Sequence, residues 1–415
     1  MNESGKLLLL FAMVKCIPAV VRLHCEKRVC TVYNLRSSED SFVYRYFPND
    51  TITVVHIHLQ VEYADRVFLE DIRPSIESVV ITASAPLARI SLSGRSNASS
   101  LTIADTGLSR LDVVEENHQL QQLLIMNSQL TRVPDMIGQL RGLVTLRIKN
   151  SPIVELDLTQ FCQLPRLYYL DVRSNQISHV FRTAPTNVRC PVPIVYVYLA
   201  ENNLSVLNMT TFDGFTRLKY LDLHNNMLHS LTDSFVGPVL QDLRLFNNNL
   251  TTLSFCQWYV PELRRLALSM NRLTGVPKCM INAPNISYLN LCSNNISSVT
   301  LATFAGMDNL RYLDVCRNRL TSAVLNSTSY PKSLATVGLG RNRLTQLDLS
   351  WVPLRKVHLG IEHNFISQFD ISKVSANVTT LTMTGNPIDC SWSAQPVPGL
   401  LHVDRASAQC VRDGD

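Results

Sequence analysis

The sequence predicts a curved leucine-rich-repeat solenoid, with a parallel β-sheet on its concave face and irregular, 3₁₀ or short helical segments on its convex face. The segment LKYLDLHNNML at 218–228 follows the spacing L-x-x-L-x-L-x-x-N-x-L and places Asn226 where the chain leaves a short strand. The pattern recurs about 14 times, mostly every 22 to 24 residues. One such unit cannot bury its own apolar face, so stacked copies must form the core.

The asparagine positions align the repeats along the chain. They fall at Ser84, Thr106, Ser128, Ser151, Asn175, Asn202, Asn226, Asn248, Asn271, Asn294, Asn318, Asn342, Asn364 and Asn386. The first four carry hydroxyls, which satisfy fewer backbone groups than an amide does, so we expect a differently shaped N-terminal third. The repeat ending at Asn364 fits only with a two-residue offset. The return segments are expected to bury Phe212 and Phe304 on the convex side.

Four regions follow from this pattern: a signal peptide at 1–19, an N-terminal cap at 20–75, repeats at 76–389 and a C-terminal cap at 390–415. Lys6 precedes the apolar run Leu7–Val14, which is too short to span a bilayer and is typical of a secretory signal. No second long apolar run follows, so we expect a secreted, extracellular protein without a membrane anchor. The net charge of +5 is mild, and no dense Lys/Arg run indicates a nucleic-acid partner.

Loss of Cys16 with the signal peptide leaves ten of the eleven cysteines, and an even number in a secreted chain favours disulfides. Equivalent positions in neighbouring repeats lie about 5 Å apart, within disulfide range. The repeat register and the caps predict five pairs: Cys25–Cys30, Cys162–Cys190, Cys256–Cys279, Cys292–Cys316 and Cys390–Cys410. The alternative for Cys292 and Cys316 is a pair of free thiols at the strand ends.

Nine N-x-S/T sequons agree with passage through the secretory pathway. They begin at Asn49, Asn97, Asn203, Asn208, Asn249, Asn285, Asn295, Asn326 and Asn377. Glycans on Asn203, Asn249 and Asn295 would lie just past the strand ends and would shield that rim.

The cap and strand-end sequences resemble those of the mosquito leucine-rich immune proteins, which belong to the extracellular leucine-rich-repeat proteins. The matching segments are HCEKRVCTVYNL, LRLFNNNL and the NPIDC…ASAQC closure. The resemblance implies a haemolymph protein of innate immunity that binds complement-like thioester proteins. Many members continue into a double cysteine and a coiled coil. This chain ends five residues after Cys410, so it resembles a coil-less member and pairing through a coiled coil does not carry over.

Residues between the core leucines of each strand point out of the concave face and are candidates for binding a partner. Tyrosine recurs there, and tyrosine is enriched in protein interfaces. The candidates are Tyr169, Tyr196, Tyr220, Tyr288, Tyr312, Asp171, Asp222, Asp314, Arg173, Arg244, Arg265 and Arg311. Two interpretations fit: a binding surface of mixed charge, or a repeat phrase in which Tyr packs on its neighbours and Asp pairs with Arg on the next strand.

Catalytic patterns are weak in this chain. His56 and His58 share one face of an expected strand without a third metal ligand, and His224 and His229 with Asp222 fit a surface polar cluster. We therefore expect no enzyme activity, metal or cofactor. The predicted function is innate immune recognition through the concave face. The predicted partners are complement-like thioester proteins, other leucine-rich-repeat chains or pathogen surface molecules, and the alternative is an extracellular adhesion or matrix module in development.

Overall fold

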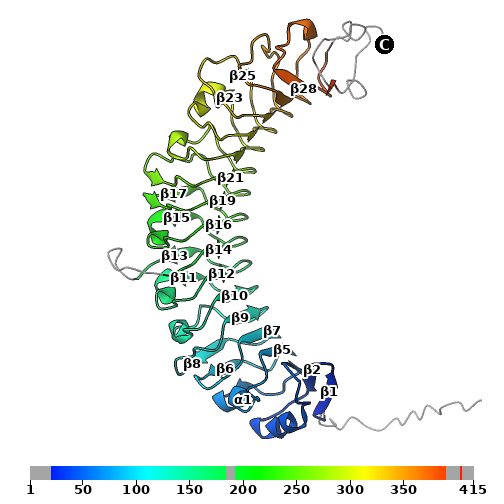
Figure 1. Ribbon diagram of the computed structural model, residues 1–415, viewed down its shortest axis with the longest axis vertical. Helices are drawn as coiled ribbons and strands as arrows, with labels where there is room; N and C mark the ends of the chain where they lie inside the picture. The colour runs from blue at the N-terminus through cyan, green and yellow to red at the C-terminus, as the bar shows by residue number, and fades with distance from the viewer. Residues whose placement is uncertain (1–19, 184–191, 389–401, 404–415) are drawn as a thin grey trace, which may run out of the picture.

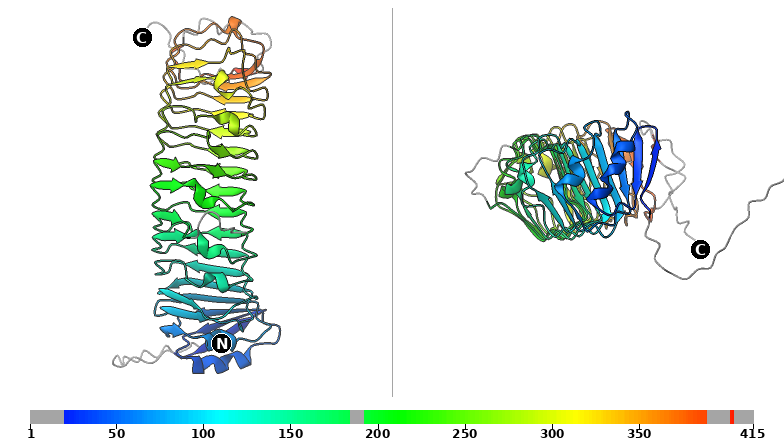
Figure 2. Two further views of the ribbon diagram at one scale, coloured as in Figure 1. Left: turned by 90° about the vertical axis from the view of Figure 1, so that its left-hand side faces the viewer. Right: turned by 90° about the horizontal axis from the view of Figure 1, so that it is seen from below.

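The computed structural model describes residues 20–183, 192–388 and 402–403, which form a leucine-rich-repeat solenoid of about 15 turns (Figure 1). Each turn contributes one strand to a long parallel sheet on the concave side and returns along the convex side. Figure 2 shows the turns stacked as rungs along a single axis. The predicted fold class is confirmed.

The long sheet has 18 strands, and all neighbouring strands after the first pair are parallel. β1 (Arg22–Glu26) pairs antiparallel with β2 and closes the N-terminal end of the sheet. The parallel strands are β2 (Val29–Tyr33), β3 (Thr53–Ile57), β5 (Ser78–Ser84), β7 (Ser100–Thr106), β9 (Gln122–Met126), β10 (Thr145–Lys149), β12 (Tyr169–Asp171), β14 (Tyr196–Tyr198), β16 (Tyr220–Asp222), β19 (Asp242–Arg244), β21 (Arg265–Ala267), β22 (Tyr288–Asn290), β24 (Tyr312–Asp314), β26 (Thr336–Gly338), β27 (Val357–Gly360), β28 (Val378–Thr382) and β29 (His402–Val403).

The opposite side of the solenoid carries short strands and single helical turns. Its strands are β4 (Tyr63–Ala64), β6 (Arg89–Leu92), β8 (Arg110–Val113), β11 (Glu155–Asp157), β13 (His179–Phe181), β15 (Val206–Asn208), β17 (Ser230–Thr232), β18 (Phe235–Val236), β20 (Trp258–Tyr259), β23 (Ser298–Thr300) and β25 (Ser322–Val324). The helical segments are α1 (Arg66–Glu70) and the 3₁₀ turns η1 (Ser38–Tyr46), η2 (Ile137–Gln139), η3 (Leu158–Phe161), η4 (Met209–Phe212), η5 (Met280–Asn282), η6 (Leu301–Phe304) and η7 (Ile371–Lys373). Phe212 and Phe304, at the ends of η4 and η6, are buried as predicted.

A ladder of buried asparagines joins each turn to the one before it. The side-chain amide of Asn226 donates to the carbonyls of Leu199 and Leu223, and its oxygen accepts from the backbone N–H of Leu204. Leu199 and Leu204 belong to the preceding turn, so one side chain satisfies backbone groups of two turns. This arrangement repeats at the later asparagine positions and explains why the sequence requires an amide there.

The residue before each ladder position has a left-handed backbone, which the sequence pattern did not predict. Asn225 (φ 53°) and Asn247 (φ 54°) tolerate this conformation comparatively well, whereas Arg317 (φ 51°) and Arg341 (φ 54°) lack that advantage. The positive φ turns the chain off the concave strand, so that the next side chain enters the core.

The solenoid sheet begins earlier than the expected boundary at residue 76. β2 and β3 already lie parallel and in register with β5, so the region expected as a cap contains two turns of the sheet behind an antiparallel hairpin. The buried Leu35 and Leu59 occupy the positions that later turns give to asparagine. An apolar residue there hides the repeat from a search based on asparagine.

Turns with a hydroxyl at the ladder position differ in shape, as expected. β5 and β7 each span seven residues, against three for β16, and their pairing extends to Ser84 opposite Thr106. β5 and β7 thus keep their pairing past the left-handed residues Ala83 and Asp105, whereas β16 ends four residues before its ladder position. The turn that ends at Asn364, where a two-residue offset was expected, also shows a shift of register against β28, between Val357 and His358.

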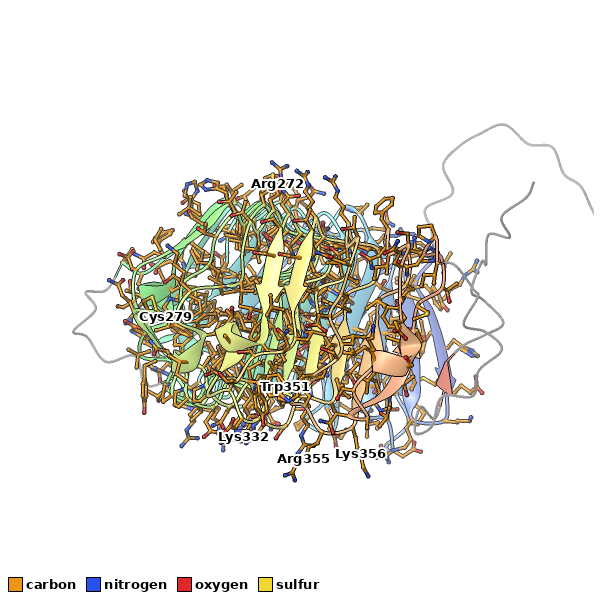
Figure 3. All side chains as sticks on the ribbon, turned by 90° about the horizontal axis from the view of Figure 1, so that it is seen from above. Arg272, Cys279, Lys332, Trp351, Arg355 and Lys356 are labelled. Carbon is orange, nitrogen blue, oxygen red and sulfur yellow. A yellow bond between two sulfur atoms is a disulfide. The ribbon has the colours of Figure 1, made fainter. Side chains whose placement is uncertain are left out.

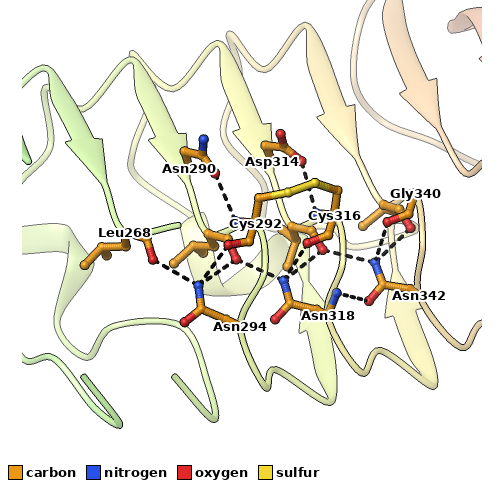
Figure 4. Close-up of a disulfide and its surroundings, with 12 residues drawn as sticks. Leu268, Asn290, Cys292, Asn294, Asp314, Cys316, Asn318, Gly340 and Asn342 are labelled. Carbon is orange, nitrogen blue, oxygen red and sulfur yellow. Dashed lines mark hydrogen bonds between the residues drawn. A yellow bond between two sulfur atoms is a disulfide. The ribbon is translucent and has the colours of Figure 1, made fainter. Parts of the chain in front are cut away.

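Three of the predicted disulfides lie within the described residues. They join Cys25 to Cys30, Cys256 to Cys279 and Cys292 to Cys316. The last bond spans β22 and β24 just beyond their ends (Figure 4), so the free-thiol alternative does not hold in this structure. Cys190, Cys390 and Cys410 lie outside the described residues, so the pairs that involve them stay predictions.

Candidate functional site

The predicted tyrosine column exists on the concave sheet. Tyr169 pairs in register with Tyr196 and Tyr196 with Tyr220, and Tyr288 pairs with Tyr312 further along. Asp242 and Arg265 occupy the two turns between these groups. Because the sheet is parallel, residues one repeat apart become direct neighbours, and a spacing of 22 to 27 residues becomes one interstrand step.

The rings in the middle of the solenoid form one continuous aromatic cluster. Tyr169 contacts Tyr198 at 5.0 Å between ring centroids, Tyr198 contacts Tyr220 at 5.0 Å, and Tyr168 contacts Tyr196 at 5.4 Å. Tyr168 is 44% exposed and the other four rings are half-buried. These distances are typical of favourable aromatic pairs, so the rings hold one another in place while part of each stays open to a partner.

Guanidinium groups lie over several of these rings. Arg147 lies 4.7 Å from the centroid of Tyr169, Arg173 4.7 Å from Tyr198, and Arg244 4.8 Å from Tyr220. A cation over the face of an aromatic ring is attracted by its quadrupole. The result is a surface of alternating rings and positive charges that needs little reordering on binding.

The aspartates support this surface from below. Asp171 and Asp222, which the sequence analysis named as candidates for binding a partner, are only 1% and 2% exposed. A partner on the concave face would therefore reach little of either side chain. Asp171 accepts two hydrogen bonds from Arg173, at 2.9 and 2.8 Å, and Asp222 bonds the ring Nδ1 of His224 at 2.5 Å. Asp171 therefore pairs with an arginine of its own turn, not with an arginine of the next strand.

The protonation states of the cluster follow from this packing. Burial raises the pKa of Tyr198 to about 12, and the pKa of Tyr220 also rises because of burial. The hydrogen bonds that the Arg173 guanidinium donates to Asp171 raise the pKa of Arg173. The hydroxyls stay protonated and the guanidinium stays charged at neutral pH, so the surface offers donors and positive charge.

A second, smaller aromatic site lies toward the C-terminus. The rings of Tyr288 and Tyr312 stack at 4.7 Å, and Arg265 lies 4.8 Å from the centroid of Tyr288. Asp314 is half-buried in the neighbouring column, and burial raises its pKa. The exposed Arg311 lies directly before the first residue of β24, at the N-terminal end of that strand.

Three aromatic residues of this face escaped the sequence analysis. Tyr168 precedes β12, Tyr198 ends β14 in the column that otherwise holds aspartates, and Phe246 stacks on His224 at 4.3 Å. Tyr198 lies in register with Asp171 and Asp222, which the sequence analysis did name, so the repeat spacing alone could have found it. Tyr168 and Phe246 lie outside the strands, where periodicity gives no signal.

The histidine pairs do not form metal sites in this structure. His56 is fully buried, whereas His58 is exposed because its positive φ turns it away from the strand. His229 is exposed beside β17, while His224 is half-buried against Asp222. Among the described residues, one group has metal-ligand geometry, namely Cys292, Asp314 and Cys316, and its two sulfurs are joined in a disulfide.

The sequon asparagines are exposed or half-buried in the structure. Asn203, Asn249 and Asn295 directly follow ladder asparagines, so they align on the rim where the chain leaves the concave strands. The amides of Asn285 and Asn377 donate to the backbone carbonyls of Pro261 and Val352. Glycosylation at all nine sequons stays a prediction.

Comparison with known families and proteins agrees with this geometry. The leucine-rich-repeat family model matches residues 194–250 and 261–324. Human leucine-rich repeats and immunoglobulin-like domains protein 1 is 29% identical over 155 residues, which are 36% of this chain and 14% of that protein. Mouse podocan is 30% identical over 140 residues, which are 32% of this chain and 22% of podocan. The matched segment thus spans less than a quarter of either relative.

Solved structures share the fold at low sequence identity. The Drosophila Toll–Spatzle complex aligns with a TM-score of 0.62 at 19% identity, over 82% of this chain and 51% of the matched chain. The LRIM1/APL1C complex gives 0.58 at 17%, over 91% and 66%. A Leptospira interrogans leucine-rich-repeat protein gives 0.57 at 17%, over 89% and 99%. At these identities the likeness establishes the fold alone.

Within the described ranges, no helix has the length and apolarity needed to cross a bilayer. The repeat family match, the asparagine ladder and the long parallel sheet agree with one another. The described part of the chain is therefore a leucine-rich-repeat solenoid.

Proposed function

We propose that the protein is a secreted recognition factor of innate immunity that binds complement-like thioester proteins or pathogen surfaces through its concave face. The observation that carries this proposal is the cluster of tyrosine rings beneath Arg147, Arg173 and Arg244. Rings and arginines that are already ordered lose little conformational entropy on contact, and both residue types are enriched at binding hot spots.

Two further features support an extracellular immune role. The three disulfides of the described chain favour an oxidising compartment. The HCEKRVCTVYNL and NPIDC segments resemble the mosquito leucine-rich immune proteins, and the Toll–Spatzle and LRIM1/APL1C structures share the fold. An adhesion or matrix role is the alternative, since the same face would serve a cell-surface partner.

A glycan placed on the concave face should abolish partner capture. Arg265→Asn with Ala267→Thr creates the sequon Asn-Leu-Thr across β21, beside the Tyr288 stack, and leaves the core Leu266 unchanged. A glycan is far larger than a side chain, so it excludes a protein from several turns of the sheet. We expect binding to a purified thioester-containing complement-like protein and to heat-killed bacteria, measured by biolayer interferometry and by sedimentation, to fall at least about tenfold, or roughly 1.4 kcal/mol.

Ser230→Asn supplies the matched control. It creates the sequon Asn-Leu-Thr on β17, which lies on the convex side (Figure 1). This variant should carry the same glycan and bind both probes as wild type does. Undiminished binding by the β21 variant, with the glycan verified by mass spectrometry, would move the site off the concave face. Binding to epithelial cells but to neither immune probe would favour the adhesion alternative.

A further inference from the structure

Five exposed arginines gather on the rim where the chain leaves the concave strands: Arg272, Arg317, Arg319, Arg341 and Arg343. Among the residues that the structure describes, no ion pair or side-chain hydrogen bond to any of them is found. Arg272 lies on the side of the solenoid opposite Lys332, Arg355 and Lys356 (Figure 3), so the rim is separate from the positive charges of that other edge. These five residues are called the arginine rim below.

The arginine rim is a row along the solenoid axis. Arg317 and Arg319 flank the ladder residue Asn318, and Arg341 and Arg343 flank Asn342 in the next turn. The two turns are direct neighbours, because the backbone N–H of Arg317 donates to the carbonyl of Gly340. Arg272 follows the ladder residue three turns before Asn342, so at about 4.8 Å per turn the row spans about 15 Å.

The loops that carry the arginines are held rigidly. The disulfide between Cys292 and Cys316 joins two turns directly before Arg317 (Figure 4). The amides of Asn318 and Asn342 donate to the backbone carbonyls two and three residues before them, in the loop that carries each arginine. Four exposed arginines thus extend from two adjacent turns whose backbones are held together, so their charges are close to one another. Their mutual repulsion is relieved when an anion binds.

Two of these arginines also occupy a position that suits them poorly. Arg317 and Arg341 have left-handed backbones, whereas other turns place Asn225 and Asn247 at the equivalent position. Asparagine tolerates this conformation better than arginine does. Ala83, Glu201 and Met270 adopt the same conformation in other turns, so the backbone accepts arginine at this position and leaves its charge exposed on the rim.

We propose that the arginine rim binds a sulfated polysaccharide running along the solenoid axis. Guanidinium forks bind sulfate oxygens in pairs, and a row of them fits a linear chain of anions better than a single ion. The disulfides favour an extracellular setting, where sulfated polysaccharides are the abundant linear polyanions. Such a site would hold the protein at cell or matrix surfaces while the concave face stays free.

The sequon at Asn295 lies within this row. Asn295 directly follows its ladder residue, as Arg272 and Arg319 do, and belongs to the turn between theirs. A glycan there would separate Arg272 from the four arginines of the later turns. Removal of the sequon by Asn295→Gln should therefore strengthen polysaccharide binding or leave it unchanged, and a weakened interaction would contradict the proposed path.

The test replaces four rim residues in the full chain, with Arg317→Asn, Arg319→Gln, Arg341→Asn and Arg343→Gln. Affinity for a heparin octasaccharide, measured by surface plasmon resonance, should fall about tenfold or more. The affinity should also depend less on salt concentration, because fewer arginine side chains contact the polysaccharide. The thermal unfolding midpoint should stay equal or rise, because asparagine relieves the left-handed strain. Loss of binding thus cannot be mistaken for loss of folding.

A variant with the same change in net charge serves as the control. Arg95, Arg166, Arg217 and Arg355 are exposed and scattered along the solenoid, and their replacement by glutamine should leave the octasaccharide affinity within about twofold of wild type. An equal loss in both variants would show a response to net charge alone and would overturn the site. Equal affinity for chemically desulfated chains, or for duplex DNA of matched length, would overturn the ligand class.

Discussion

Replacement of Asn318 by alanine is expected to destabilise the C-terminal turns by about 2 to 4 kcal/mol. The side-chain amide of Asn318 donates to the carbonyls of Leu291 and Val315, and its oxygen accepts from the backbone N–H of Ile296. The ladder carbonyls keep other amide partners, but the N–H of Ile296 loses its acceptor inside the core. Urea unfolding followed by hydrogen exchange of peptides from 286–345 measures the loss where it arises.

Serine at the same position should fall between wild type and alanine. The N-terminal turns already use Ser84, Ser128 and Ser151 at ladder positions, where the hydroxyls of Ser128 and Ser151 bond each other at 2.7 Å. An isolated Asn318→Ser variant has no such neighbour and keeps only part of the bonding. Asn309→Ala is the control, because Asn309 is exposed and its amide donates to the side chain of Asn285 at the surface. A loss below about 0.5 kcal/mol for Asn318→Ala would contradict a stabilising ladder.

The repeating part of the fold was predictable because the same chemical requirement recurs in every turn. A buried amide must bridge two turns, and the strand before it must bury every second residue, so Asn226 and its equivalents set the register of the whole sheet. The same register placed Cys256 opposite Cys279 and Cys292 opposite Cys316. Neither inference needed a side-chain conformation.

The parts that escaped prediction depend on side-chain direction or on an absent motif. The two turns that carry Leu35 and Leu59 were missed because the search for repeats relied on a polar residue at the ladder position, and leucine has no group that can bond a backbone carbonyl. The register of Asp171 and Asp222 was predicted correctly, but the sequence did not show that Arg173 and His224 bond these carboxylates and that both are buried. The arginine rim does not stand out as a charged run in the sequence, because its members are 2 to 45 residues from Arg317. They become neighbours only when the turns of the solenoid stack on one another.

Acidification is expected to open the N-terminal turns before the rest of the solenoid, and His56 is the cause. Its ring is fully buried against Phe68, its Nε2 lies 3.4 Å from the hydroxyl of Tyr44, and its Nδ1 has no hydrogen-bond partner among the described residues. Burial lowers the pKa of His56 to about 3. The folded chain therefore keeps the ring neutral at a pH where the unfolded chain would protonate it.

The sign and size of the effect follow from proton linkage. An unfolded histidine has a pKa of about 6.5, so below that pH the unfolded chain binds a proton that the folded turn excludes. The free energy of unfolding is unaffected by His56 well above pH 6.5 and falls as the pH drops toward 3. The total loss approaches about 4 to 5 kcal/mol. At pH 4.5 the expected loss is already about 2 to 3 kcal/mol.

His56→Ile should remove this pH dependence, because Val32 and Ile81 occupy the same register in the strands on either side and show that an aliphatic side chain fits there. Hydrogen exchange of peptides covering β3, followed from pH 7.5 to 4.5 and corrected for the intrinsic exchange rate, measures the local opening free energy in a repeat array that does not unfold in two states. His24→Thr is the matched control, since His24 is exposed on β1 and should leave the acid response unchanged. If the Ile variant opened at acid pH as readily as wild type, the acid sensitivity would belong to another group. Stability independent of pH in the wild type would instead mean that the buried ring gains a partner on protonation, which the aromatic rings of Tyr44 and Phe68 packed around it do not offer.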